Sequence, residues 1–228
     1  SPDMTLDAAQ SAKYERICEL ADLKSGEDVL EVGCGWGGFA ELAAGKYRCN
    51  VTGLTLSNEQ HAFARERLLM QGLSDRTDIV LRDYRHEEGQ YDKIVSIEMF
   101  EAVGEEHWPT YFEMIRKRLK PGGKAVLQII TIDDDRFETY RRGADFIQRY
   151  IFPGGMLPSP TALSAAVNAA GLELRHSEFF GKSYARTLAE WQRSFQHAWD
   201  GIAKQGFDLR FKRMWEYYLA YCETGFDQ

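Results

Sequence analysis

An acidic residue followed by spaced glycines is the segment of this sequence best suited to chemistry. Glu31 lies within an apolar run, Val29 to Val32, and Gly33, Gly35 and Gly38 after it satisfy the spacing G-x-G-x-x-G. Glycines let a ligand approach the backbone closely, and a helix that begins among them presents unbonded amides. The spacing therefore predicts a cofactor site where a buried parallel strand runs into a helix.

The position of Glu31 favours S-adenosylmethionine over a dinucleotide as the cofactor. A carboxylate two residues before Gly33 would repel a pyrophosphate, but it could accept hydrogen bonds from an amino group or a ribose hydroxyl. A dinucleotide site also expects an acid at the end of the next strand, whereas the strand expected at residues 50–54 is followed by Thr55. Alternatively, Glu31 is a solvated carboxylate at a strand end, and the glycines only form a turn.

Polar residues follow each of the expected strands. The hydrophobic pattern predicts further strands at residues 78–81, 91–97 and 124–132, alternating with helices. In an open parallel sheet, ligands bind beyond the carboxyl ends of the strands. One edge of the sheet should therefore carry the side chains that end or follow these strands, which are Glu31, Thr55, Asp83, Glu98 and Glu101.

Two candidate ligand residues near this edge also have structural explanations. Asp83 could accept a hydrogen bond from an adenine amine, or it could pair with Arg82 or Arg85. Ser57 and Gln60 match the S-x-x-Q capping box, which alone would explain both residues. A ligand role for Gln60 therefore needs other support.

The whole pattern predicts an α/β fold, namely a Rossmann-like, doubly wound, mostly parallel sheet with a helical, aromatic-rich cap. We expect residues 1–132 to form the cofactor-binding core and residues 133–160 to form an inserted cap. Residues 161–228 should supply the final helix and strand of the core and two amphipathic helices, all within a single domain overall.

Local signals predict several helix ends and one more strand. Thr5 should cap a helix over residues 5–23, and Ser159 should cap a helix that ends near residue 170. A sixth strand is expected at residues 172–180, before the two amphipathic helices, which should begin at residue 187. The remaining helices are expected at residues 39–46, 57–71 and 108–119.

Composition limits the classes of function. The chain has 228 residues, 44% of them hydrophobic, and a net charge of −7, which argues against broad binding of nucleic acid. Its four cysteines show no C-x-x-C spacing and its five histidines form no H-E-x-x-H, so we expect no metal site. The longest apolar runs have the length of a strand, so we expect a cytoplasmic protein without a membrane-spanning helix. The sequence starts at Ser1 rather than methionine, which indicates a trimmed chain or a fragment.

Five motifs in this chain carry a resemblance to a known family. They occupy residues 31–38, 53–60, 100–104, 150–155 and 210–215, and the resemblance that they carry covers nearly the whole chain. In these motifs the chain resembles the cyclopropane-fatty-acyl-phospholipid synthase family, which includes the mycolic acid methyltransferases. The resemblance implies a class I methyltransferase that uses S-adenosylmethionine as methyl donor and a cis-unsaturated acyl chain of a phospholipid as acceptor. It also implies that the family's segment before the first helix and its last strand are missing from this sequence.

The resemblance further implies the residues of the site. The cofactor-binding residues would be Glu31, Gly33, Gly35, Thr55, Leu56, Gln60, Asp83 and Tyr84. The catalytic residues would be Glu101, Gln128, Ile130 and Tyr184, arranged around a bicarbonate that acts as the base.

Two positions depart from the family pattern. Gln128 stands where the family has a histidine, and Ala102 stands where a second histidine often follows the glutamate. Glutamine can hydrogen-bond a bicarbonate but cannot relay a proton. We therefore expect as product either a cyclopropane or a methyl-branched or methylene acyl chain.

Two other functions remain open on the sequence alone. The chain could be a small-molecule N- or O-methyltransferase of the same fold, or a lipid- or cofactor-binding protein that has lost catalysis. Aromatic residues make up 13% of the chain and are concentrated in the cap and tail. This favours an apolar, cation-tolerant pocket and a carbon acceptor.

Cationic residues beside aromatic ones predict peripheral contact with anionic lipid at the inner membrane surface. The alternative is that these cationic side chains are solvated or paired with acids. They are Arg141, Arg142, Arg149, Arg210, Lys212 and Arg213.

Overall fold

The computed structural model describes residues 4–227 of the chain. These residues divide into two compact units, which are described separately below. The larger unit comprises residues 10–174, and the smaller one joins residues 4–9 to residues 175–227. The expected partition into core, cap and tail remains a prediction.

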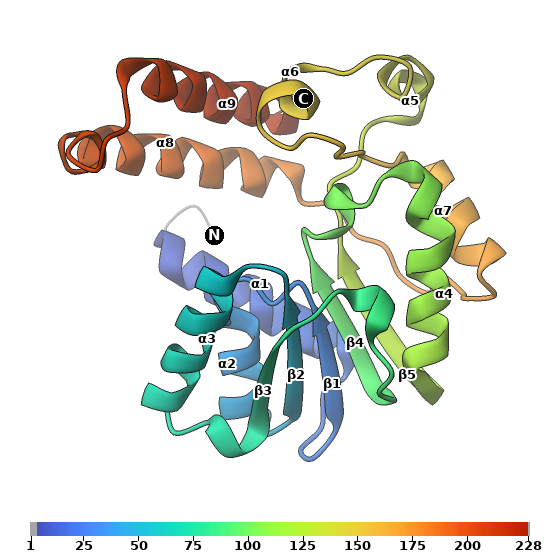
Figure 1. The fold of residues 1–228 in the computed structure, drawn as a ribbon. Coiled ribbons are helices and arrows are strands. Elements are labelled where there is room, and N and C mark those ends of the chain that lie inside the picture. The colour runs from blue at the N-terminus through green and yellow to red at the C-terminus, as the bar shows by residue number, and fades with distance from the viewer. Residues whose placement is uncertain (1–3, 228) are drawn as a thin grey trace. The chain divides into compact units, whose positions relative to one another are not determined.

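A five-stranded parallel sheet forms the centre of the larger unit (Figure 1). The strands lie in the order β3-β2-β1-β4-β5. Strands β2 and β3 therefore lie on one side of β1, and β4 and β5 lie on the other side. Such a reversal of strand order is the place where open parallel sheets bind ligands. The strands are β1 Asp28–Val32, β2 Asn50–Thr55, β3 Thr77–Leu81, β4 Tyr91–Ile97 and β5 Leu119–Gln128.

Helices cover both faces of this sheet, with α1, α2 and α3 on one face and α4, α5 and α7 on the other. Alternation along β1 explains the two layers, because Val29 packs with the first group of helices whereas Leu30 and Val32 pack with the second. The predicted doubly wound α/β fold is therefore confirmed. The helices are α1 Leu6–Ala21, α2 Gly38–Gly45, α3 Asn58–Met70, α4 Trp108–Arg118, α5 Asp134–Tyr140 and α7 Pro160–Ala169.

Residues 133–160, the expected cap, pack against the second face of the sheet. Phe137 and Met156 are buried there, and the Phe137 ring stacks 6.4 Å from that of Trp108. The short helix α6 (Phe146–Tyr150) begins with a complete capping box formed by Asp145 and Gln148. The Gln148 amide also donates to the carbonyl of Gly155 at 3.0 Å, which anchors the glycine-containing loop after α6.

Most expected elements form, and the differences have physical causes. Thr5 and Ser159 accept hydrogen bonds from backbone amides at the starts of α1 and α7, as predicted. The fifth strand begins at Leu119 rather than at residue 124, because the turn residues before it already pair with β4 through an irregular register. It ends at Gln128 rather than at residue 132.

The expected sixth strand at residues 172–180 is wrong, since this segment forms no strand. Apolar residues stabilise a strand when their side chains have a face to bury. Leu174 and Phe179 instead remain 49% and 74% exposed. Within residues 4–227, β5 is therefore an edge of the sheet.

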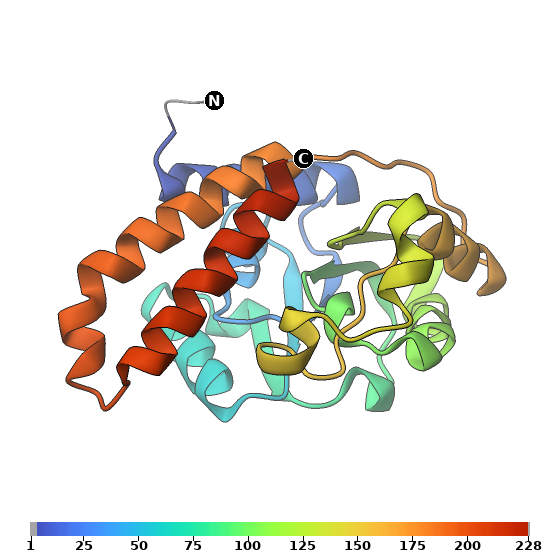
Figure 2. The ribbon, with the colours of Figure 1, turned by 90° about the horizontal axis from the view of Figure 1, so that it is seen from above.

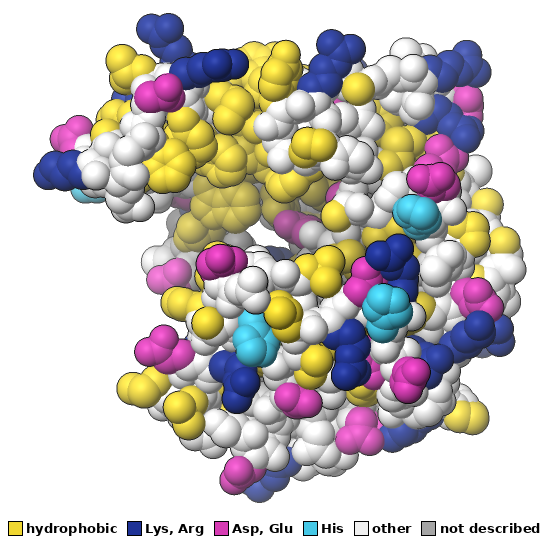
Figure 3. Space-filling view, in the orientation of Figure 1, with side chains coloured by type: hydrophobic (Ala, Val, Ile, Leu, Met, Phe, Trp, Pro, Cys, Tyr) yellow, Lys and Arg dark blue, Asp and Glu magenta, His cyan; other side chains and the backbone are white. Residues whose placement is uncertain are grey.

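Two long helices dominate the smaller unit, α8 (Gly181–Ala203) and α9 (Leu209–Asp227), which lie side by side in Figure 2. They are antiparallel, because Tyr184 near the start of α8 contacts Phe226 near the end of α9, with ring centroids 4.6 Å apart. Helix α8 begins at Gly181, earlier than the expected residue 187. Hydrophobic side chains gather over this helical pair in Figure 3. No helix within residues 4–227 is both long enough and apolar enough to cross a membrane.

Candidate functional site

The glycine-rich turn after β1 adopts a backbone that residues with a Cβ avoid. Gly33, Gly35 and Gly37 have φ angles of 80°, 53° and 80°, all in the left-handed region. A Cβ on Gly33 would lie 2.7 Å from the side chain of Met99. The amides of Gly33 and Cys34 donate to the Leu54 carbonyl at 3.1 and 2.8 Å, so β2 holds the turn in place.

Glu31 lies at the carboxyl end of β1, directly before this turn, and only 2% of its surface is exposed. Its Oε2 atom is buried without a hydrogen-bond partner. Burial raises the pKa of Glu31 well above its ordinary value, although the Ala40 backbone amide acts in the opposite direction. The alternative interpretation of a solvated carboxylate is therefore wrong, because Glu31 is buried.

Thr55 ends β2 and orients Gln60 at the start of α3. The Thr55 hydroxyl donates to Gln60 Oε1 at 2.9 Å and accepts from the Ser57 amide at 3.2 Å. Ser57 caps α3 by accepting from the Gln60 amide at 3.2 Å, but the Gln60 side chain does not return to Ser57. Only half of the expected capping box forms. The Gln60 side chain therefore presents its NH₂ group as a donor, while Leu56 beside it is 72% exposed.

Asp83 and Tyr84 follow β3. Asp83 pairs with an arginine, which is the alternative that the sequence left open for it. The Asp83 carboxylate accepts from Nε and Nη2 of Arg85 at 3.0 and 2.6 Å. The hydrogen bond from Arg85 holds the pKa of Asp83 below its ordinary value. The Tyr84 ring packs edge-on against the Tyr111 ring, with centroids 5.4 Å apart. Arg82, the other expected partner, pairs with Glu87 instead.

Glu101 lies in a short helical turn after β4 and faces the chain that follows β5. Its Oε1 atom accepts from the backbone amide of Ile130, and its Oε2 atom is buried without a partner. Its backbone carbonyl accepts from the Met156 amide at 2.8 Å. Burial raises the pKa of Glu101 to about 7, although the Ile130 amide lowers it. Glu101 therefore exchanges its proton near neutral pH and lies against residues of the expected cap.

Gln128 is the last residue of β5, and its amide donates to the side chain of Glu98. The backbone amide of Glu98 donates in turn to the Gln128 carbonyl at 2.9 Å. The larger unit thus brings together Glu101, Ile130, Gln128 and Glu98 at the ends of β4 and β5. The pairing of Glu98 with Gln128 was missed by sequence reasoning, because no local pattern connects the two positions.

Tyr184 belongs to the smaller unit, near the start of α8. Its ring contacts Phe226 and lies 6.0 Å from the ring of Trp191, edge-on. The roles predicted for Tyr184 and for the other site residues remain predictions.

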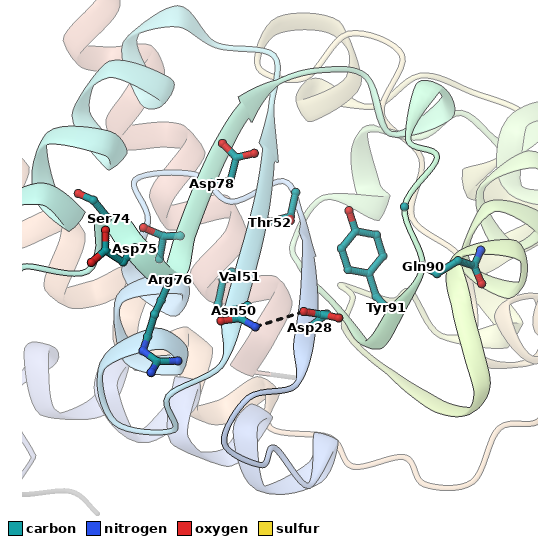
Figure 4. A pocket seen from close by; sticks show the side chains of 12 residues that line it. Asp28, Asn50, Val51, Thr52, Ser74, Asp75, Arg76, Asp78, Gln90 and Tyr91 are labelled. Atoms are coloured by element: carbon teal, nitrogen blue, oxygen red, sulfur yellow. Dashed lines mark hydrogen bonds between the residues drawn. The ribbon is translucent and has the colours of Figure 1, made fainter.

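A depression lies at the opposite edge of the sheet, at the amino ends of the strands (Figure 4). Polar side chains line it, and Asn50 donates to Asp28 there at 3.3 Å. It does not include the glycine turn, Glu31 or Glu101, so it is separate from the candidate site. Among residues 4–227, no cluster of three His, Cys, Asp or Glu side chains could hold a metal ion.

Comparisons with known proteins agree with this geometry. Residues 1–228 match the family model described as mycolic acid cyclopropane synthetase. The chain is 42% identical over 222 residues to tuberculostearic acid methyltransferase UfaA1 of Mycobacterium tuberculosis, covering 97% of this chain and 52% of that protein. It is 40% identical over 221 residues to the cyclopropane-fatty-acyl-phospholipid synthase of Escherichia coli strain K12, covering 97% of this chain and 55% of that protein.

A solved structure has the same fold. Mycolic acid cyclopropane synthase CmaA1, complexed with SAH and CTAB, matches with a TM-score of 0.91 at 30% identity, covering 99% of this chain and 82% of that chain. The chain therefore belongs to the mycolic acid cyclopropane synthetase family. It spans about half the length of the curated relatives that it matches.

Proposed function

We propose that this member of the mycolic acid cyclopropane synthetase family transfers the methyl group of S-adenosylmethionine to a cis-unsaturated acyl chain of a phospholipid. The observation that carries the proposal is a pair of buried carboxyl oxygens without partners, on Glu31 and Glu101. Both lie at the carboxyl edge of the sheet, beside a glycine turn at the point where strand order reverses. The names of two relatives, a tuberculostearic acid methyltransferase and a cyclopropane-fatty-acyl-phospholipid synthase, support the reaction class.

The residues at this edge fit the cofactor. The left-handed glycines keep the turn free of side chains, and Gln60 offers an oriented NH₂ donor. Burial raises the pKa of Glu31 well above its ordinary value, and its carboxyl group can exchange hydrogen bonds with ribose hydroxyls. The bound cofactor would supply an electrophilic sulfonium methyl group. The residues proposed to hold it are Glu31, Gly33, Gly35, Thr55, Leu56, Gln60, Asp83 and Tyr84.

Glu101 is the group that fits a bicarbonate ion. With a pKa of about 7, it can donate a proton from Oε2 to an anion while the Ile130 amide holds Oε1. Gln128 has a second amide hydrogen beyond the one it gives to Glu98. We assign the anion site to Glu101, Gln128, Ile130 and Tyr184, and the product to a cyclopropane or a methyl-branched or methylene chain.

The acceptor lipid would be met at the inner membrane surface by α8 and α9. Leu209 and Tyr217 on α9 are 66% and 54% exposed, and the Lys212 ammonium lies 5.2 Å from the Trp199 ring centroid. In the cap, by contrast, Arg141 and Arg142 pair with acids, in line with the alternative interpretation. Flotation with vesicles that contain anionic lipid tests this contact, and binding that is independent of anionic lipid would contradict it.

Mass spectrometry of membrane lipids tests the reaction. Expression of the protein in a host without such an enzyme should add one CH₂ to unsaturated phospholipid chains, and the Glu101→Gln variant should not. A cyclopropane ring resists mild hydrogenation, whereas a methylene branch takes up hydrogen. Unchanged lipids together with methylation of small amines or alcohols would replace this proposal with the heteroatom methyltransferase. Cofactor binding without transfer to any acceptor would indicate a binding protein.

A further inference from the structure

Glu98 occupies a backbone conformation that is unfavourable for its residue type. It directly follows β4 and has a φ angle of 53°, in the left-handed region that glycine adopts at no steric cost. Asp22 and Arg48 also have positive φ angles, but of the three only Glu98 lies at the carboxyl edge of the sheet, and strained residues are common at ligand-binding sites. The roles assigned above to the site residues do not use this carboxylate.

The Glu98 side chain is anchored at the edge of the sheet. Gln128 donates to it, and the Glu98 amide donates to the Gln128 carbonyl at 2.9 Å. These two hydrogen bonds join the ends of β4 and β5. The carboxylate is therefore held in one place, which is what recognition of a small charged group requires.

Glu98 lies next to the first glycine of the cofactor turn. Strands β1 and β4 are neighbours, with Val32 opposite Ser96. The Met99 side chain, which follows Glu98, packs against Gly33. The proposed adenine and ribose contacts lie at the ends of β3 and β2, on the other side of β1. A cofactor that crosses the edge from β3 toward β1 therefore brings its amino-acid end to β4.

Lys13 of α1 supplies a cation near the glycine turn. Tyr14 packs against Gly38 at the start of α2, where an added Cβ would lie 3.0 Å from its hydroxyl oxygen. The Lys13 ammonium lies 4.9 Å from the Tyr14 ring centroid. Burial lowers the pKa of Lys13, and the Glu98 carboxylate opposes this by raising it. Lys13 and Glu98 thus present opposite charges to the region beside the turn.

Glu31 is poorly suited to bind an ammonium group. Burial raises the pKa of Glu31 well above its ordinary value, which disfavours the charged form of this carboxyl. A positive charge is better balanced by an acid that is less deeply buried. Glu98, which is half-buried beside the same turn, is such an acid.

We propose that Lys13 and Glu98 form a clamp for the zwitterionic amino-acid end of S-adenosylmethionine. Glu98 binds the α-ammonium group, and Lys13 binds the α-carboxylate. The clamp rests on the proposed function, since it acts on the same cofactor. It adds two binding residues that come from α1 and the end of β4.

Calorimetry with two ligands tests the clamp. S-adenosylhomocysteine carries the amino-acid end, whereas 5′-methylthioadenosine keeps the adenosine and the sulfur but lacks it. Glu98→Gln and Lys13→Met should each lower the affinity for S-adenosylhomocysteine by about 10-fold or more, as expected for the loss of a charged hydrogen bond. The affinity for 5′-methylthioadenosine should stay nearly unchanged. The matched control is Lys24→Met, since Lys24 is exposed and pairs only at the surface with Asp22.

Glu98→Gly separates binding from folding. Glycine relieves the left-handed strain but also removes the acceptor of the hydrogen bond from Gln128. Because these effects oppose each other, the thermal midpoint should stay close to that of the wild type while affinity for S-adenosylhomocysteine falls. Equal loss of both ligands in the variants would show that the pair only shapes the turn, and unchanged affinity for S-adenosylhomocysteine would also overturn the clamp. If the wild type itself does not bind S-adenosylhomocysteine, the proposed function fails, and the clamp fails with it.

Discussion

The carboxyl groups at the two ends of the same sheet differ in their hydrogen-bond partners. At the amino edge, Lys120 donates to Asp28 and Asp92 at 2.8 and 2.9 Å, and the Asp28 amide donates to Asp92 at 2.9 Å. The hydrogen bond from Lys120 holds the pKa of Asp92 below its ordinary value. At the carboxyl edge, Glu31 and Glu101 each leave one buried oxygen without a partner, and burial raises the pKa of both.

This difference separates stabilising charges from functional ones. A buried polar atom without a partner costs about 1–3 kcal/mol, so the carboxyl edge is destabilised by its own acids. Perturbed acids of this kind cluster at sites where a ligand completes the missing hydrogen bonds. The amino edge needs no ligand to balance its charges. Variants at the two edges should therefore separate catalysis from stability.

Glu101→Gln should give the largest effect. Loss of a group that exchanges a proton near neutral pH should lower turnover by about 10²–10⁴-fold, with little change in affinity for S-adenosylmethionine. Steady-state kinetics on unsaturated phospholipid vesicles and calorimetry measure the two quantities. A variant with a near-normal rate would show that the proton chemistry does not depend on Glu101.

The pH dependence of stability should follow from the same residue. Because the pKa of Glu101 rises from 4.5 to about 7 on folding, its protonation stabilises the fold fully below pH 4.5, and this contribution is lost as pH rises through 7. The difference amounts to about 3 kcal/mol at 1.36 kcal/mol per pH unit. Thermal midpoints measured from pH 4 to 8 should fall less for Glu101→Gln than for the wild type. Identical slopes would contradict the raised pKa.

Glu31→Ala should lower the affinity for S-adenosylmethionine by about 10-fold, because one hydrogen-bonding partner of the ligand is lost. The variant also removes the buried oxygen that has no partner, so its thermal stability without ligand should fall little. Calorimetry and thermal melts measure both. Unchanged affinity would remove Glu31 from the cofactor site.

Asp92→Asn at the amino edge should give the smallest effect. Lys120 and Asp92 are 36% and 32% exposed, and ion pairs of this kind contribute about 0–1 kcal/mol. Chemical denaturation should show a loss within this range, while turnover and cofactor affinity stay at the wild-type values. A large fall in turnover would mean that the two edges are not independent.

Sequence patterns could predict the sheet and the strand-end positions, because both depend on local periodicity. Apolar runs located β1 to β4, and capping residues located the starts of α1 and α7. The edges of the sheet were less predictable. The sequence of residues 172–180 predicts a strand, but strand formation depends on a neighbouring strand and a buried face, which the local sequence does not specify.

The candidate site was predictable only where a residue's position along a strand decides its place. Glu31 and Thr55 could be located because Glu31 is the penultimate residue of β1 and Thr55 is the last residue of β2. The pairing of Gln128 with Glu98 depends on two strands that are distant in sequence, so no local signal reveals it. Lys13 looks like any polar residue of a helix, and only the packing of Tyr14 against the glycine turn brings it near the site.

The strand order of the sheet also has a consequence for how the chain folds. Strands β1, β2 and β3 pair with their neighbours in sequence. Val29 of β1, by contrast, pairs with Lys93 of β4, which lies beyond two further strands and two α-helices in the sequence. Closing such a long loop costs entropy before the new contacts repay it, which slows folding. We therefore expect the pairing of β1, β2 and β3 to form before β4 joins β1. On this expectation the carboxyl edge that carries the site is completed late in folding, when β4 and β5 join.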